Sequence, residues 1–174
     1  MTDKNIKYVP FATEIMSARR PHLSEPETEG EYADGRYKTE ATATEGYAQR
    51  FMEQIQKISV SYFGDKKAVH LPWKNTKEGD IAFIFRSPKK KPELLDSKGV
   101  PLSKSVIIRE GCLVRIAGVI AGWEKGAMSG VSLWLDAVRV IRLVEGFDAS
   151  KLFGPPDEGF DVSIAYRFYG AHHF

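Results

Sequence analysis

The feature that most constrains the fold is a pair of alternating apolar segments between residues 111 and 146, joined by a short stretch that contains glycine. In residues 112–123 and 131–142, apolar side chains recur at every second position, which is the period of a β-strand. The connection "EKGAMSG" places Gly126 and Gly130 where a hairpin needs flexible backbone. The alternation changes phase near Asp136–Val138, which indicates a β-bulge. The sequence therefore predicts a long, bulged β-hairpin.

The two faces of this predicted hairpin differ in chemistry. One face is aliphatic and consists of Cys112, Val114, Ile116, Ile120, Val131, Leu133 and Leu135. The other carries an arginine, two tryptophans and several small residues, namely Arg115, Trp123, Trp134, Ala117, Ala121 and Ser132. Small neighbours leave room for a planar ligand against an indole ring. Bases of single-stranded nucleic acid stack on such rings while Lys and Arg contact the phosphates. This face is therefore a candidate site for single-stranded nucleic acid.

An alternative assigns the tryptophans to the core. The C-terminal segment 145–174 has no clear period, and its rings Phe147, Phe153 and Phe160 need partners. If the segment docks through these rings, Trp123 or Trp134 packs underneath it. We expect the segment to be irregular and partly docked. The predicted division is a β-domain at residues 1–145 and a tail at 146–174.

The rest of the chain is predicted to form three shorter strands and one helix. Alternation marks the strands at residues 10–21, 37–44 and 80–87. An acidic loop (24–36), a loop with an exposed Trp73 (67–80) and a basic, Pro-rich connection (88–103) complete the chain before the hairpin. The order strand, strand, helix, strand, long strand, long strand predicts a mainly β fold with one α-helix. We expect a five-stranded antiparallel barrel of the oligonucleotide-binding (OB) type over residues 1–145.

Local signals refine two of these elements. In the first strand, alternation places Phe11, Thr13 and Ile15 on one face, and Ala12, Glu14 and Met16 on the other. The apolar stripe of the helix consists of Tyr47, Phe51, Ile55, Ile58 and Tyr62. Thr42 and Glu45 are predicted to form a capping box, and Gly64 stands where the end of a helix favours a positive φ.

Composition places the chain among ordinary globular proteins. Its 174 residues are enough for one well-packed domain, and a net charge of +2 leaves the partner undecided. Cys112 is the single cysteine, so no disulfide forms within the chain and the thiol is predicted to be buried. The start "MTDKNIKYVP" lacks the apolar region of a signal peptide, and no apolar run reaches the roughly 18–20 residues that span a bilayer. We therefore expect a cytoplasmic protein with no membrane partner.

Basic residues outside the hairpin gather near strand ends. Arg19 and Arg20 end the first strand, and Arg86 and Lys89–Lys91 follow the third. Because strand ends of a barrel converge on one rim, separate basic loops can form one groove; the alternative is that the triple lysine is a solvated loop. The candidate nucleic-acid-binding residues are Arg20, Tyr37, Lys38, Arg86, Lys89, Lys90, Lys91, Arg115, Trp123, Lys125, Trp134 and Arg139.

Carboxylates are concentrated in one loop, which contains Glu25, Glu27, Glu29, Glu31 and Asp34. Alternating glutamates in a flexible loop are usually solvated. A second hypothesis follows from the separation of this loop from the basic stretch 86–91. The loop folds over the basic groove and competes with nucleic acid for it.

Sequence motifs for cofactors and catalysis are not found. There is no Gly-rich phosphate loop, and the four His and one Cys lack the spacing of zinc ligands. We expect no cofactor and no catalytic activity. Two alternatives remain open. One is a metal-dependent nuclease in which Glu14, Asp80 and Asp136 converge on a metal ion. The other is a protein–protein adaptor whose aromatic face docks a polymerase, primase or nuclease.

The second half of the sequence resembles a known family. The segments "KKPELLDSKGVPLS", "IREGCLVRIAGVIAGWEKG" and "GVSLWLDAVRVIR" are similar to the single-stranded DNA-binding proteins of tailed bacteriophages and prophages. The similarity covers roughly residues 80–145 and is looser from Pro10 to Gly64. The matching positions are Lys91, Pro92, Asp96, Gly111, Cys112, Val114, Arg115, Gly130, Val131, Ser132 and Leu135.

This resemblance implies a five-stranded OB fold, sequence-tolerant binding of single-stranded DNA, and a role in phage DNA replication or recombination in the cytoplasm of an infected bacterial cell. Duplex DNA, bound more weakly, and phage replication proteins are further implied partners. Two positions depart from the family pattern, since Leu113 replaces an aromatic residue and Trp134 replaces a glycine. The last residues, "YRFYGAHHF", end in Phe174 but are not acidic, unlike the tails through which related phage proteins recruit polymerase.

Overall fold

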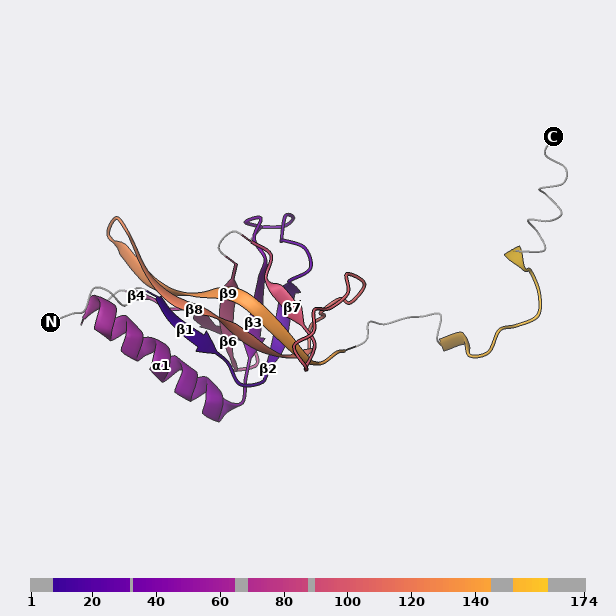
Figure 1. The fold of residues 1–174 in the computed structure, drawn as a ribbon, viewed down its shortest axis with the longest axis horizontal. Coiled ribbons are helices and arrows are strands. Elements are labelled where there is room, and N and C mark those ends of the chain that lie inside the picture. The colour runs from indigo at the N-terminus through magenta and orange to yellow at the C-terminus, as the bar shows by residue number, and fades with distance from the viewer. Residues whose placement is uncertain (1–7, 32, 65–68, 88–89, 145–151, 163–174) are drawn as a thin grey trace, which may run out of the picture.

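The computed structural model describes residues 8–31, 33–64, 69–87, 90–144 and 152–162 (Figure 1). The sequence-predicted residues Lys89, Phe147 and Phe174 lie outside these ranges. The elements, in chain order, are β1 (Tyr8–Ala12), β2 (Met16–His22), β3 (Lys38–Thr42), α1 (Glu45–Phe63), β4 (Val69–His70), β5 (Trp73–Asn75), β6 (Ile81–Arg86), β7 (Glu93–Leu95), β8 (Leu113–Lys125) and β9 (Met128–Arg142). Within the described residues, no helix is long and apolar enough to span a membrane.

Five strands close into a barrel in the order β2, β3, β6, β9, β8 and back to β2. The predicted five-stranded OB barrel with one helix is confirmed. The strands are not all antiparallel, however, because β6 runs parallel to β9. A ring of five strands cannot alternate direction all the way round, so one parallel pair is a geometric necessity. The short strands β4 and β7 also pair with β9 in parallel.

The predicted first strand is split into β1 and β2, both of which pair with β8. Thr13 bridges the break, because its backbone N–H donates to the Ile116 carbonyl (2.8 Å) and its Oγ1 accepts from the Ile116 N–H (2.9 Å). The kink then reverses the faces. Ile15, predicted to lie beside Phe11 and Thr13, is 49% exposed, and Met16 is buried. The predicted faces were therefore wrong beyond Thr13.

Helix α1 packs its apolar stripe against the barrel. Phe51 and Ile55 are fully buried, and the Phe51 ring stacks on Phe83 with centroids 4.9 Å apart. Truncating a buried phenylalanine of this kind costs roughly 3–5 kcal/mol. Gly64 ends the helix with φ 67°, as predicted. In Figure 1, α1 runs along the side of the sheet away from the loop between β2 and β3.

The start of α1 differs from the prediction. Its N-cap is Thr44, whose Oγ1 accepts from the Tyr47 N–H at 3.5 Å. Thr42, the predicted cap, instead belongs to β3 and pairs with Ser17 and Ala82. The capping box of Thr42 and Glu45 was therefore wrong, because Thr42 still pairs within the sheet and the residue that precedes the helix is Thr44.

The long hairpin of β8 and β9 is confirmed. Ala117 pairs with Ala137 but Gly118 pairs with Leu135, so Asp136 is the extra residue of the predicted bulge. Gly118 is required here, because a Cβ at this position would lie 1.7 Å from the Trp134 carbonyl oxygen. Cys112 is fully buried, as predicted, and its Sγ accepts from the backbone N–H groups of Arg109 and Val144.

Short strands replace parts of two predicted loops. β4 and β5 lie within residues 67–80, and β7 lies within 88–103. Trp73 is consequently half-buried, with its ring edge on Phe83 at a centroid distance of 6.0 Å, rather than exposed. In the C-terminal segment, Phe153 and Phe160 are 80% and 85% exposed, so neither ring covers Trp123 or Trp134.

Candidate nucleic-acid interface

One row of paired residues brings aromatic and basic side chains together across the barrel. Val119 of β8 pairs with Trp134 of β9, which pairs with Arg86 of β6. Arg86 pairs with Lys38 of β3, and Lys38 pairs with His22 of β2. Paired residues of neighbouring strands share a face, and the residues beside this row, such as Leu133, Phe85 and Thr39, are buried. The row therefore points outward, and Lys38, Arg86 and Trp134 from the predicted set lie on one surface.

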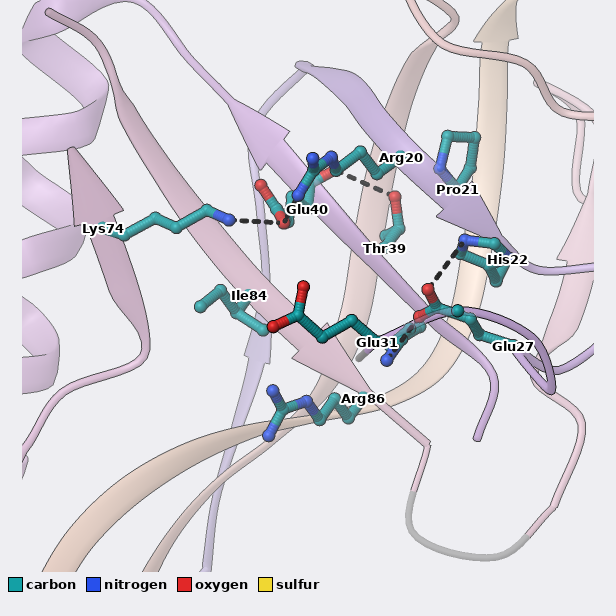
Figure 2. Close-up of a pocket in the computed structure, with 12 residues that line it drawn as sticks. Arg20, Pro21, His22, Glu27, Glu31, Thr39, Glu40, Lys74, Ile84 and Arg86 are labelled. Carbon is teal, nitrogen blue, oxygen red and sulfur yellow. Dashed lines mark hydrogen bonds and ion pairs between the residues drawn. The ribbon is translucent and has the colours of Figure 1, made fainter. Parts of the chain in front are cut away.

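A groove of about 780 Å³ adjoins this row (Figure 2). It lies over β3 and β6 and is bounded by β2, by β5 and by the loop between β2 and β3. In OB folds this face and this loop form the usual surface for binding oligonucleotides. The charged residues in the groove lining are Arg20, Glu27, Glu31, Lys38, Glu40, Lys74 and Arg86, and His22 lies among them.

Glu40 lies at the centre of a cluster of cations in the groove. Its carboxylate is 2.9 Å from the Lys74 ammonium, 3.7 Å from the Arg19 guanidinium and 3.9 Å from that of Arg20. These ion pairs hold Lys74 and Arg20 at the wall of the groove, where Figure 2 shows them. Lys74 is a groove residue that the sequence interpretation missed, since nothing in the loop 67–80 indicated a strand beside β6.

The backbone at Arg20 is unusual. Its φ of 47° is the single positive value among the described non-glycine residues. It lies where the pairing of β2 with β3 shifts register, between Arg19 and His22. A left-handed conformation at a non-glycine residue costs of order 1 kcal/mol and is often found at binding sites. The side chain of Arg20 is 59% exposed and lines the groove.

The acidic loop lies on the groove. Lys38 Nζ is 2.5 Å from the Glu27 carboxylate and 3.3 Å from that of Asp34, and Glu27 is 3.8 Å from His22 Nε2. The hydrogen bond from Lys38 lowers the pKa of Glu27. For Asp34, burial favours a raised pKa, but hydrogen bonds from the Arg36 N–H and from Lys38 outweigh it and the pKa is lowered. Figure 2 shows Glu31 extending into the groove beside Ile84 and Arg86.

Aromatic side chains continue the surface beyond the row. The Trp134 ring lies against Tyr8, with centroids 5.4 Å apart and planes tilted by 43°. The Trp123 ring stacks on the His70 ring, with centroids 6.0 Å apart and an angle of 14° between the ring planes. The Trp123 indole covers Gly130, where a Cβ would come within 2.4 Å of the ring. Both tryptophans are half-buried, with neighbours that the sequence interpretation did not include.

The remaining predicted residues lie apart from the groove. Arg115 and Arg139 face each other on β8 and β9, on the far side of the bulge from Trp134. Lys125 is exposed at the hairpin tip, and Lys90 and Lys91 are exposed between β6 and β7. Tyr37 is half-buried just before β3, where its carbonyl accepts from the Ser87 N–H. The structure therefore gathers only part of the predicted set into one groove.

The carboxylates of the nuclease alternative do not come together. In the part of the chain that the structure describes, no three His, Cys, Asp or Glu side chains form a group that could hold a metal ion. Glu14 instead pairs with Arg50 of α1 at 2.7 Å.

Solved structures of phage proteins share this architecture. The single-stranded DNA binding protein gp2.5 of bacteriophage T7 matches with a TM-score of 0.62 and 17% sequence identity, over 88% of this chain and 98% of that one. This is the fold of phage single-stranded DNA-binding proteins. The single-stranded DNA-binding protein of bacteriophage Enc34 in complex with ssDNA matches with a TM-score of 0.61 and 17% sequence identity, over 83% of this chain and 91% of that one. A separate structure of the Enc34 protein matches with a TM-score of 0.60 and 18% identity, over 93% of this chain and 91% of that one. No protein-family model and no curated protein matches the sequence.

Proposed function

We propose that this protein binds single-stranded DNA with little sequence preference and performs no chemical step. The observation that carries the proposal is the outward row in which Trp134, Arg86 and Lys38 follow one another across three strands. Rings stack on bases of any sequence, and guanidinium and ammonium groups contact the phosphates between them. The fold shared with two phage proteins of this activity supports the same conclusion.

The proposed path of the strand follows these residues. One part of the strand lies in the groove, where Arg20, Lys38 and Arg86 contact phosphates. The other part crosses the hairpin, where bases stack on Trp134 with Tyr8 and on Trp123. Lys125 at the tip, and Lys90 and Lys91 between β6 and β7, extend the positive surface. Duplex DNA binds more weakly, because its bases are already stacked on each other.

The biological setting follows from this proposal. A single-strand binder of this fold protects DNA exposed during phage replication or recombination, inside an infected bacterial cell. Phage replication proteins are then the expected protein partners. In this proposal residues 1–145 form the binding domain and residues 146–174 form a separate tail.

Tryptophan fluorescence tests the proposal directly. The protein is titrated with oligo-dT of about 16 nucleotides, the upper end of what one OB fold covers, at low and high salt and without metal. We expect quenching that weakens with salt. Trp134→Ala should weaken binding roughly five- to hundredfold, as loss of one stacked base does. Trp73→Phe is the matched control, because Trp73 packs on Phe83 in the barrel wall.

The result that overturns the proposal is equally direct. If the wild-type protein shows neither quenching nor a gel shift with oligo-dT, the aromatic surface does not serve DNA. A lowered melting temperature of Trp134→Ala with unchanged DNA affinity would assign that ring to packing. In that case stacking on Trp134 would be rejected while binding itself stood.

A further inference from the structure

Two arginines outside the groove form an arrangement that the fold itself does not favour. Arg115 of β8 and Arg139 of β9 are directly paired across the hairpin. Like charges opposite each other on neighbouring strands destabilise a sheet. Among the described residues, neither guanidinium forms an ion pair with a carboxylate, and the hydrogen bond found for this pair runs from Arg115 Nε to the Thr13 carbonyl (2.8 Å). The unfavourable pairing points to an anionic ligand that is not part of the chain.

Two acidic groups on segments that adjoin this pair are engaged elsewhere. Arg139 pairs with Leu95 of β7, and its guanidinium lies beside Gly99, in the turn that follows β7. That turn contains Asp96, whose Oδ1 accepts from the backbone N–H groups of Lys98 and Val100. Glu14, which follows Thr13, pairs with Arg50. In the described part of the chain, these two carboxylates therefore have other partners and form no ion pair with Arg115 or Arg139.

A shallow apolar pocket of about 140 Å³ opens between the two arginines. Ala12, Ala117 and Ala137, from three paired strands, form a flat floor, and Leu95 closes one side. Pockets that enclose a whole small ligand measure roughly 300–1,000 Å³. This pocket therefore suits a single flat group such as one base, with the attached anionic backbone outside, at the guanidinium groups.

The pocket continues the outer surface of β8. Val119, which pairs with Trp134, is followed on the same face by Ala117 of the floor and then by Arg115. Alternate residues of a strand are roughly 7 Å apart, so Arg115 lies roughly 13 Å from the Trp134 pair. A single strand that leaves the stack at Trp134 and runs along β8 reaches the pocket next.

We propose that this arginine pocket is a second subsite for single-stranded DNA, in which one base lies on the alanine floor and its phosphate lies between Arg115 and Arg139. The proposal rests on the proposed function and extends the DNA path across the bulge, away from the groove.

The experiment compares two variants of β9, each of which replaces one arginine with glutamine and so removes one positive charge. Arg139→Gln removes an arginine of the pocket, whereas Arg142→Gln removes an exposed arginine at the end of β9, which pairs with Leu113 and does not line the pocket. Binding of oligo-dT of about 16 nucleotides is measured over a series of salt concentrations. We expect Arg139→Gln to weaken binding and to lower the salt slope by about 0.7, the value for one phosphate contact on a single strand. Arg142→Gln should leave the slope unchanged.

A third variant separates base from phosphate. Ala117→Leu fills the floor without changing charge, so it should weaken binding of the same oligonucleotide at an unchanged salt slope. Melting temperatures of all variants show whether each remains folded. Equal slopes for Arg139→Gln and Arg142→Gln, with the wild type binding normally, would overturn the arginine pocket and leave the proposed function intact. Failure of the wild type to bind would overturn both.

Discussion

The acidic loop on the groove leads to a prediction that runs against ordinary expectation for a binding site, namely that removing its side chains improves binding. Glu27 and Asp34 occupy the ammonium of Lys38, and Glu31 extends beside Arg86. A phosphate that approaches Lys38 has to displace these carboxylates. The variant Glu27→Gln with Asp34→Asn therefore frees the cation and removes two negative charges from the path of the DNA.

The size of the effect follows from the exposure of these pairs. The three side chains lie at the surface and are partly exposed, and ion pairs at a protein surface are weak, so each of the two is equivalent to roughly a two- to fivefold change in Kd. We expect the double variant to bind oligo-dT roughly tenfold more tightly at an ionic strength of about 0.1 M, where the Debye length is about 10 Å. The gain should vanish near 1 M salt, where the Debye length is about 3 Å.

The structure also supplies the controls. Backbone hydrogen bonds of Glu27 with Arg36 and Gly35 hold the loop, so the side-chain changes leave its conformation intact. Glu29→Gln removes an exposed charge of the same loop that does not line the groove, and its effect should be small. In a Lys38→Gln background the gain should largely disappear. Unchanged or weaker binding by the double variant at low salt, with an unchanged melting temperature, would refute the idea that the loop competes with DNA.

Three further predictions concern stability. Gly118→Ala should lower the free energy of unfolding by roughly 3 kcal/mol, because the new Cβ meets a backbone carbonyl that cannot rotate away; Gly46→Ala, whose Cβ meets only ordinary contacts, is the control in urea denaturation. Arg20→Gly should leave the melting temperature nearly unchanged, since relief of the left-handed strain offsets the added flexibility of glycine, while DNA affinity falls. Asp96 has a lowered pKa because the N–H groups of Val100 and Lys98 bond its carboxylate, and Lys38 lowers that of Glu27. The stability that these groups contribute is complete above the ordinary carboxyl pKa of about 4 and is lost as pH falls through their lower folded pKa values. The urea concentration at the unfolding midpoint should therefore decrease when the pH is lowered below about 4, and it should decrease less for Asp96→Asn.

The long, regular elements were predictable from sequence. The hairpin, its bulge at Asp136 and the Phe51 face of α1 were confirmed, because each repeats its period over many residues. The strands β4, β5 and β7 were missed because two or three residues do not establish a period. The break at Thr13 was missed for a different reason. Its side-chain hydroxyl replaces a backbone acceptor in the β-ladder, and the alternation of apolar and polar residues gives no sign of such a replacement.

The site was less predictable than the fold. Trp134, Arg86 and Lys38 were each proposed from sequence, but their alignment in one row depends on the register of three strands, which no local pattern encodes. Tyr8 and His70 were not considered, because they lie in a polar N-terminal stretch and in a two-residue strand. Alternation of Tyr8, Pro10 and Ala12 on the exposed side of β1 was the one available signal.

The helix beneath the hairpin has a consequence for the rate at which the proposed DNA ligand would associate. Tyr62 of α1 lies directly under Gly122, where a side chain would come within 2.9 Å of its ring, so the arm that carries Trp123 rests on the helix. A braced arm loses little conformational entropy when a ligand binds, and such preorganisation preserves the free energy that stacking provides. We therefore expect association to be limited by encounter and charge steering rather than by folding of the arm, with a rate that falls with salt.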